Sequence, residues 1–373
     1  MLYTKPDYYD KFHCLADGCE DTCCAGWQIV IDDKSLRNYQ MQKGSFGKRL
    51  RDSIDVKEST FRQTKDKRCA FLNEENLCDL QLALGEEALC KTCRNYPRHI
   101  EEFENVREIT LSVSCPEVAR ILMEQKEPVQ LVSVEKEGEE EFEDFDPFLY
   151  SFLVDARAVM RDILQDRKKP LSIRAGLVLG IAHDMQVRIN RGDLFSCEEV
   201  FRKYQKESAA AFVKKKLTEK FADKDAFYHW SKHLFGKLHE LELLFPDWEA
   251  HLSETEFLLY DMGSYVYEKR RRNFGKWAKE NLPDLEIMLE QLMVYFMDTY
   301  FCGAVYDGEV YAKMRMAVDS VFYLYEMFTA RFIKNEGELD KEDIILLVYR
   351  FSRELEHSDT NLERMEQFHI YRT

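Results

Sequence analysis

Apolar residues recur at helical spacing through the later part of the chain. One stripe starts at Phe148 and runs into Ile163, and three further stripes repeat at i, i+3, i+4 and i+7, which is typical of the core-facing side of an amphipathic helix. Gly176 and Gly180 form a small-residue pair that predicts a close helix crossing. The pattern therefore predicts an all-helical domain over residues 148–373. The three stripes are Leu285, Met288, Leu289, Leu292, Tyr295 and Phe296; Val318, Val321, Phe322, Tyr325, Phe328 and Phe332; and Ile344, Leu347, Val348, Phe351 and Leu355 behind a helix start at Asp343.

Residues 1–125 show shorter and less regular patterns. Alternating apolar residues predict two strands, and short periodic segments predict two helices, over residues 27–31, 106–113, 35–51 and 86–96 respectively. The chain has 15 Gly and 8 Pro, whereas average usage would give roughly 26 and 19, and this shortage favours long helices. We therefore expect a mainly α protein, in which a small, irregular, cysteine-rich, metal-binding N-terminal domain with short strands precedes the larger helical domain.

Residues 126–147 lie between these two predicted domains and differ from both in composition. Eight acidic residues and one lysine lie between Glu135 and Asp146. A solvated acidic linker is the first interpretation of this stretch. The alternative is that its negative charge gathers a lysine-bearing substrate.

Composition and charge exclude several broad classes of protein. The 373 residues are 45% hydrophobic and carry a formal net charge of −16, which argues against nucleic acid as the main partner. A mean hydropathy of −0.47 and the lack of an apolar run near 18 residues argue against a membrane span. The segment from Met1 to Asp10 contains no apolar core like that of a signal peptide, so a cytoplasmic location is expected.

The cysteines are the most informative residues. Nine of the eleven lie before residue 116, and in a reducing compartment such dense cysteines bind metal more often than they form disulfides. Soft thiolate ligands select zinc or iron–sulfur clusters. Buried free thiols are the alternative interpretation. The predicted metal ligands are Cys14, Cys19, Cys23, Cys24, Cys69, Cys78, Cys90, Cys93 and Cys115.

The cysteine spacing leaves the identity of the metal open. Four thiolates satisfy either one zinc ion or one [4Fe–4S] cluster. A zinc ribbon needs two CxxC pairs, and Cys90 and Cys93 form only one. The C-x3-C-x2-C run of radical S-adenosylmethionine enzymes is also incomplete, because Gly26 stands at the third place after Cys19 and Cys23.

Four other side chains near the cysteines could take part in a site. His13 and His99 flank the cysteine motifs and are interpreted as surface or hydrogen-bonding histidines rather than as ligands. Asp21 is interpreted as a turn or cap residue, with a charge near the metal as the alternative, and Trp27 as a core aromatic rather than a substrate platform. No GxGxxG, GxxxxGK[ST], HExxH or GxSxG motif occurs, so the catalytic and cofactor-binding residues stay unassigned.

The cysteine motifs and their neighbours, taken as a set, resemble the flagellin lysine-N-methylase family. The same cysteine layout is found in a wider group of proteins described as zinc- or iron-chelating, and the matching motifs cover about a third of the chain. The motifs are Phe12-x-Cys14, the run from Cys19 to Ile29 with Ile31-Asp32, Cys69-Ala70-Phe71-Leu72, Leu77-Cys78, Gly85, the run from Leu89 to Arg98, and the run from Leu111 to Glu117.

This resemblance implies a function that composition and spacing do not. It implies methyl transfer from S-adenosylmethionine to lysine side chains of flagellin in the bacterial cytoplasm before export. It also implies a [4Fe–4S] centre near the reaction, with zinc as the alternative metal. A non-enzymatic metal-binding or redox-sensing cysteine-cluster module is the alternative function, and the sequence predicts no oligomeric state.

Overall fold

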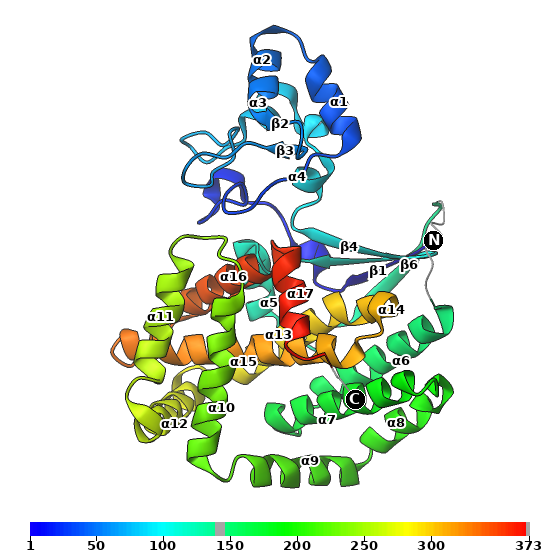
Figure 1. Cartoon of the computed structure of the whole chain (residues 1–373), viewed down its shortest axis with the longest axis vertical. Coiled ribbons are helices and arrows are strands. Elements are labelled where there is room, and N and C mark those ends of the chain that lie inside the picture. Colours follow the sequence, from blue (N-terminus) through cyan, green and yellow to red (C-terminus); the bar gives the residue numbers. More distant parts are fainter. Residues whose placement is uncertain (139–145, 371–373) are drawn as a thin grey trace.

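The computed structural model describes residues 1–138 and 146–370 and shows a mainly α protein, as predicted (Figure 1). A small lobe rich in cysteine lies at one end of the long axis, and a larger body of helices lies at the other (Figure 1). No helix in these described ranges is long and apolar enough to cross a membrane. The strands are β1 (Leu2–Pro6), β2 (Ile54–Asp55), β3 (Thr60–Phe61), β4 (Arg98–Phe103), β5 (Val106–Leu111) and β6 (Leu131–Glu135).

The helices are short in the first part of the chain and long in the second. The first four are α1 (Asp33–Met41), α2 (Gly44–Asp52), α3 (Asp79–Leu84) and α4 (Lys91–Asn95). The others are α5 (Pro116–Glu124), α6 (Pro147–Leu164), α7 (Leu171–Asn190), α8 (Cys197–Tyr204), α9 (Glu207–Lys220), α10 (Lys224–Gly236), α11 (Trp248–Leu259), α12 (Gly263–Asn281), α13 (Leu285–Tyr300), α14 (Ala304–Asp307), α15 (Val310–Lys334), α16 (Lys341–Glu356) and α17 (Asp359–Gln367).

The apolar stripes of the sequence become the core of the helical body. Helix α15 is buried on most of its sides and packs against α7, α11, α13 and α16, as expected of a helix that is apolar nearly all round. Gly176 and Gly180 of α7 confirm the predicted close crossing, because an added Cβ would collide with Val213 of α9 and Tyr204 of α8. Helix α16 begins earlier than predicted, at Lys341.

Side-chain caps set where two of the long helices begin. At α6, Asp146 accepts hydrogen bonds from the backbone N–H groups of Phe148 and Leu149. At α16, the cap is Asp340, which accepts from the N–H of Asp343. Both contacts satisfy N–H groups that have no partner within the helix. Asp343 is therefore a residue of the first turn and not the start of α16.

A four-stranded sheet packs beside the helices with the order β4-β5-β1-β6. The strand β5 confirms the predicted strand at residues 106–113, whereas β1, β4 and β6 were not predicted. β1 pairs in parallel with β5 and antiparallel with β6. On β5, the buried Glu108 forms an ion pair with the buried Arg157 of α6, which joins the sheet to the helical body.

Three predictions for the cysteine-rich segment are wrong in detail. The predicted strand at residues 27–31 has the expected alternation, with Ile29 and Ile31 buried and Val30 exposed, but it makes only an isolated bridge to Thr60. An extended segment without a ladder of backbone hydrogen bonds is not a strand. The predicted helix at residues 35–51 is two helices, α1 and α2. The chain turns between them, and Gly44 has a φ of +77°. The predicted helix at residues 86–96 is a short 3₁₀ turn followed by α4.

Buried apolar residues fall into two clusters. The smaller one runs from Ile29 to Cys90, within residues 13–95, which we call the cysteine lobe. The larger one holds the helical core together with Tyr8, Phe103 and Leu111, so the sheet and α5 share the core of the helical body. The predicted domain boundaries at residues 125 and 147 stay predictions. Within the predicted linker at residues 126–147, β6 is ordered secondary structure, and residues 139–145 lie outside the described residues.

Candidate functional site: the cysteine cluster and the cleft beside it

Six of the predicted ligands lie together in the cysteine lobe. Cys23 Sγ and Cys24 Sγ are 4.0 Å apart, and the backbone N–H of Cys69 donates to the carbonyl of Cys24. Cys90 caps the N-terminus of α4 and Cys93 lies in that helix, so both project from one turn. These cysteines and Cys78 lie close enough that the negative charge of one thiolate raises the pKa of its neighbours.

Two thiol pairs within this group are polarised in the same way. The contact between the Cys23 and Cys24 thiols, in which either sulfur can be the donor, lowers the pKa of Cys23 to about 7, while the same contact and burial raise the pKa of Cys24. In the second pair, the hydrogen bond from Cys93 lowers the pKa of Cys90, and the pKa of Cys93 rises. Each pair therefore contains one thiol that ionises readily, and the thiolate is the form that binds metal.

Cys14, Cys19 and Cys115 form a second neighbourhood that meets the first at Cys23. Burial raises the pKa values of Cys19 and Cys115, and neighbouring cysteines add to this rise. The neighbours are Cys23 and Cys14 for Cys19, and Cys19 and Cys23 for Cys115. Cys14 is exposed, whereas Cys115 is buried at the N-terminus of α5. The two remaining cysteines of the chain, Cys197 and Cys302, are buried in the helical body.

The chemistry of this donor set suits zinc or an iron–sulfur cluster, because it offers soft thiolates from several separate segments. Two buried nitrogen atoms near it, Arg353 Nη2 and His357 Nδ1, have no hydrogen-bond partner in the part of the chain that the structure describes. The side chains are not arranged as a complete coordination sphere. Within residues 1–138 and 146–370, no three Cys, His, Asp or Glu side chains converge as ligands of one ion.

Arg353 of α16 anchors the cysteine motif to the helical body. Its Nη1 donates to Asp21 Oδ2 at 2.6 Å, and its Nε donates to the carbonyl of Ser114 at 2.9 Å. Burial raises the pKa of Cys19, and the Arg353 charge opposes this rise; the same charge adds to the effect of the Cys24 contact that lowers the pKa of Cys23. Asp21 is therefore an interlobe ion-pair partner beside the cysteines, in addition to accepting the backbone N–H of Thr22 as a local turn residue.

Glu356, at the end of α16, accepts hydrogen bonds from hydroxyl groups of α13, of α16 itself and of the loop after β5. It accepts hydrogen bonds from Ser112 at 2.6 Å, from Ser352 at 2.6 Å and from Tyr295 at 2.8 Å. Burial raises the pKa of Glu356, although these three hydroxyls oppose the shift. The carboxyl group is thereby held in one position beneath the junction of the two lobes.

His357 and Trp27 meet at the same junction. Their ring centroids are 4.6 Å apart, and Trp27 Nε1 donates to the carbonyl of Cys23 at 2.9 Å. His357 Nε2 lies 3.0 Å from Ser114 Oγ, and burial together with the Arg353 charge lowers the pKa of His357 to about 3. Trp27 is therefore a half-buried contact between the cysteine motif and α16, not a residue of the lobe's core.

A cleft of about 580 Å³ opens beside α4 and β4, next to the cysteine cluster. Trp27 and Thr92 line it from the cysteine lobe, Tyr96 lines it from the turn after α4, and residues 98–102 line it from β4. Thr92 lies between Cys90 and Cys93, so the cleft adjoins the CxxC turn. Its size is within the usual range for ligand sites.

His99 lies in this cleft and makes a hydrogen bond with a carboxylate, as predicted. Its Nε2 is 2.7 Å from Glu101 Oε1, and its ring is 5.6 Å from that of Tyr300. Burial alone would lower the pKa of His99, but the hydrogen bond and charge of Glu101 raise it. His13, by contrast, is exposed.

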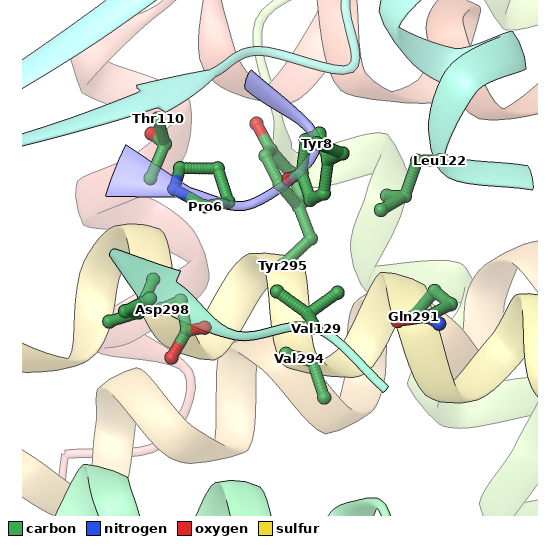
Figure 2. Close-up of a pocket in the computed structure, with 10 residues that line it drawn as sticks. Pro6, Tyr8, Thr110, Leu122, Val129, Gln291, Val294, Tyr295 and Asp298 are labelled. Carbon is green, nitrogen blue, oxygen red and sulfur yellow. The ribbon is translucent and has the colours of Figure 1, made fainter. Parts of the chain in front are cut away.

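A second, much smaller cavity lies between the end of β1 and α13 (Figure 2). Tyr8, Gln291 and Asp298 are among its lining residues (Figure 2). Its volume is about 10 Å³, which is room for at most one water molecule. This cavity is a packing gap in the core and not a ligand site.

Arg353, Glu356 and His357 were not predicted as site residues from the sequence. The sequence held a signal for Glu356, because a polar residue there continues a core-facing helical spacing. Ile345, Tyr349, Ser352 and Glu356 follow i, i+4, i+7 and i+11 along α16. A polar residue at such a position must find partners in the folded chain.

Comparison with known proteins points to one family. Lysine-N-methylases of Salmonella typhimurium and Salmonella choleraesuis are each 31% identical over 131 residues, which is 33% of this chain and 33% of theirs. The flagellar biosynthetic protein FliU of Salmonella muenchen is 31% identical over 131 residues, which is 78% of its length. The match thus spans about a third of the length of the two lysine-N-methylases.

No solved structure matches the chain significantly. A family model described as the FliB lysine N-methylase C-terminal domain matches residues 157–370. This range covers α7–α17 and the second part of α6, from Arg157 on, and it is more than half of the chain. The chain therefore belongs to the FliB lysine N-methylase family.

Proposed function

We propose that the chain is a protein-lysine N-methyltransferase that acts on flagellin with S-adenosylmethionine as the methyl donor. Membership of the FliB lysine N-methylase family is the observation that carries this proposal. The names of its relatives, two lysine-N-methylases and one flagellar biosynthetic protein, support the reaction and the substrate. The cytoplasm is the proposed location, because flagellin is made there before export.

We further propose that the cysteine cluster holds an iron–sulfur centre, with zinc as the alternative. The nine candidate ligands lie in two adjoining groups that meet at Cys23. When bound, such a centre would tie the cysteine lobe to the helical body and supply redox or Lewis-acid chemistry beside the cleft. Cys115 would contribute from the helical body, and Arg353 would place a positive charge beside the thiolates.

The reaction sets one requirement that the protein itself must meet. A lysine ammonium has a reference pKa of ~10.4, so roughly one molecule in 10³ is neutral at pH 7. Only the neutral amine has the lone pair that forms the new N–C bond as the methyl group leaves the donor's sulfur. A partly enclosed site that removes water from the amine, or offers it a base, would meet this requirement.

The decisive experiment purifies the full chain without oxygen and measures its iron, sulfide and zinc content and its visible spectrum. The metal-replete protein is then incubated with S-adenosylmethionine and flagellin of the same organism. We expect lysine-containing flagellin peptides to gain the mass of one or more methylene groups. If the metal centre is intact and no peptide gains mass, the non-enzymatic metal-binding or redox-sensing module is the better function.

A further inference from the structure

The cleft between α4 and β4 has no assigned role in the family match, because it lies outside residues 157–370 apart from Tyr306 at its rim. Two features of its lining point to a ligand: the carboxylate of Glu101 and the aromatic rings of Trp27, Tyr96 and Tyr306. Resting on the proposed methyltransferase function, we propose that this cleft binds the side chain of the substrate lysine, with Glu101 as the acceptor of its ammonium group.

Glu101 is suited to this role by its position. It lies on β4, a strand at the edge of the sheet, and is partly exposed inside the cleft. Its Oε1 is bonded to His99 Nε2, so the side chain is held in one orientation. A carboxylate fixed in this way forms a charge-assisted hydrogen bond with an ammonium group at a low cost in side-chain entropy.

The other charged groups of the cleft are engaged or lie at its rim. Arg98 donates from Nε to the hydroxyl of Tyr9 at 2.8 Å, and its guanidinium lies over the rings of Tyr9 and Phe12. Glu102 is paired with Arg107 at 3.1 Å. Lys91 is exposed. Glu101 is also bonded, through Oε1, but its partner is His99 rather than an arginine, so Glu101 is the carboxylate best placed to receive a cation within the cleft.

Aromatic rings flank the path to Glu101. The rings of Trp27, in the cysteine lobe, and Tyr96, in the turn after α4, are 6.1 Å apart. Tyr306, which is 45% exposed, belongs to α14 of the helical body. Indole and phenol faces attract alkylammonium groups, and the methylene groups of lysine pack against them. These walls would also retain a methylated ammonium, which is larger and less hydrated than the unmethylated one.

The exposure of the lining favours a side chain of a protein over a small cofactor. Small-molecule sites enclose most of their ligand, whereas Ile100 and Tyr306 are exposed and the other lining residues are at most partly buried. The lining includes Thr92 of the CxxC turn and Trp27, whose indole donates a hydrogen bond to the carbonyl of Cys23. A lysine that enters here would bring its amine beside the cysteine cluster.

Fluorine NMR of the full, metal-replete chain labelled with 5-fluorotryptophan tests the inference directly. The chain has four tryptophans, and a Trp27→Phe variant assigns the signal of Trp27. The probe is Nα-acetyl-lysinamide, and its norleucine analogue has nearly the same shape without the ammonium group. We expect the lysine probe to shift the Trp27 signal in a saturable way, and the norleucine probe to leave it in place.

Two matched variants show which carboxylate is responsible. Glu101→Gln should abolish the shift and raise the KM for flagellin about 10- to 100-fold, the usual effect of losing one charge-assisted hydrogen bond. Glu249→Gln, at an exposed glutamate of α11 that is not part of the cleft lining, should change neither. Equal metal content in both variants excludes a general loss of structure.

Three results would overturn the inference: no shift with the lysine probe, an equal shift with norleucine, or a shift of the Trp27 signal with S-adenosylmethionine alone, which would make the cleft the donor's site. These results are separate from a failure of the proposed function. Flagellin methylation without a lysine-induced shift would refute only the cleft. A lysine-induced shift without methylation would refute only the methyltransferase.

Discussion

Asp21 and Arg353 are 332 positions apart in the chain, yet they form an ion pair of 2.6 Å that joins the cysteine motif to helix α16. The Arg353 side chain is 2% exposed and that of Asp21 is 35% exposed. The guanidinium is therefore the buried member of the pair and depends on Asp21 for its neutralisation. This contact holds the loop between Cys19 and Cys23 against the helical body.

Asp21→Asn should lower the free energy of unfolding by about 1–3 kcal/mol. The substitution keeps the shape of the side chain but leaves the buried Arg353 charge without its counterion. We expect the lower part of this range because Asp21 is partly exposed. Urea unfolding measures the effect, and Asp10→Asn, which removes an exposed partner of Lys5, is the control that should change little. Equal effects of the two variants would contradict the importance of the interlobe pair.

Gly26→Ala should weaken the contact between the lobes. Gly26 has a φ of +90°, and an added Cβ would collide with the ring of Phe245 in the loop before α11. Gly85→Ala is the matched control, because Gly85 has a φ of +86° but open space around it. Backbone strain alone costs about 1–3 kcal/mol, so Gly85→Ala should lose that amount and Gly26→Ala more. Limited proteolysis of the cysteine lobe should show the same order, and a reversed order would rule out the clash.

The stability of the protein should depend on the protonation of Glu354. Its two carboxylate oxygens accept the N–H groups of Leu244 and Phe245 at 2.8 Å each, yet burial raises its pKa from 4.5 to about 7. The folded protein therefore holds this proton more tightly than the unfolded chain does. The stability from Glu354 is fully present below about pH 4.5 and is lost as the pH rises through about 7.

Urea unfolding at several pH values checks this dependence against a Glu354→Gln variant, which cannot titrate. The difference in unfolding free energy between wild type and variant should fall by roughly 1–3 kcal/mol between pH 4.5 and pH 8. A constant difference across this range would show that Glu354 has an ordinary pKa in the folded protein.

Cys93→Ser should lower both the metal content and the melting temperature of protein purified without oxygen. Cys93 belongs to the polarised pair with Cys90, and loss of one ligand removes part of the binding free energy that contributes to folding. Cys197→Ser is the control, because Cys197 is buried in α8, away from the cluster. It should keep its metal even if its stability falls. Unchanged metal content and melting temperature in Cys93→Ser would remove Cys93 from the ligand set.

The helical body could be predicted well because its signal is local. Residues three and four apart share a face of a helix, so an apolar stripe such as Leu285 to Phe296 reports a buried helix without knowledge of its partner. The same holds for the small residues of α7. The strand prediction at residues 27–31 failed for a related reason. Alternation reports an extended, half-buried segment, but a strand also needs a neighbour along its whole length, and only Val30 has one.

The candidate site divides in the same way between sequence and tertiary structure. The cysteine motifs, their thiol chemistry and the family resemblance could be read along the chain, because each depends on residue type and short spacing. The partnership of Asp21 with Arg353, of Ser112 with Glu356, and of Trp27 with His357 could not. Each joins residues that are hundreds of positions apart, and which polar groups meet is decided only when the helices pack and every buried polar group must find a partner.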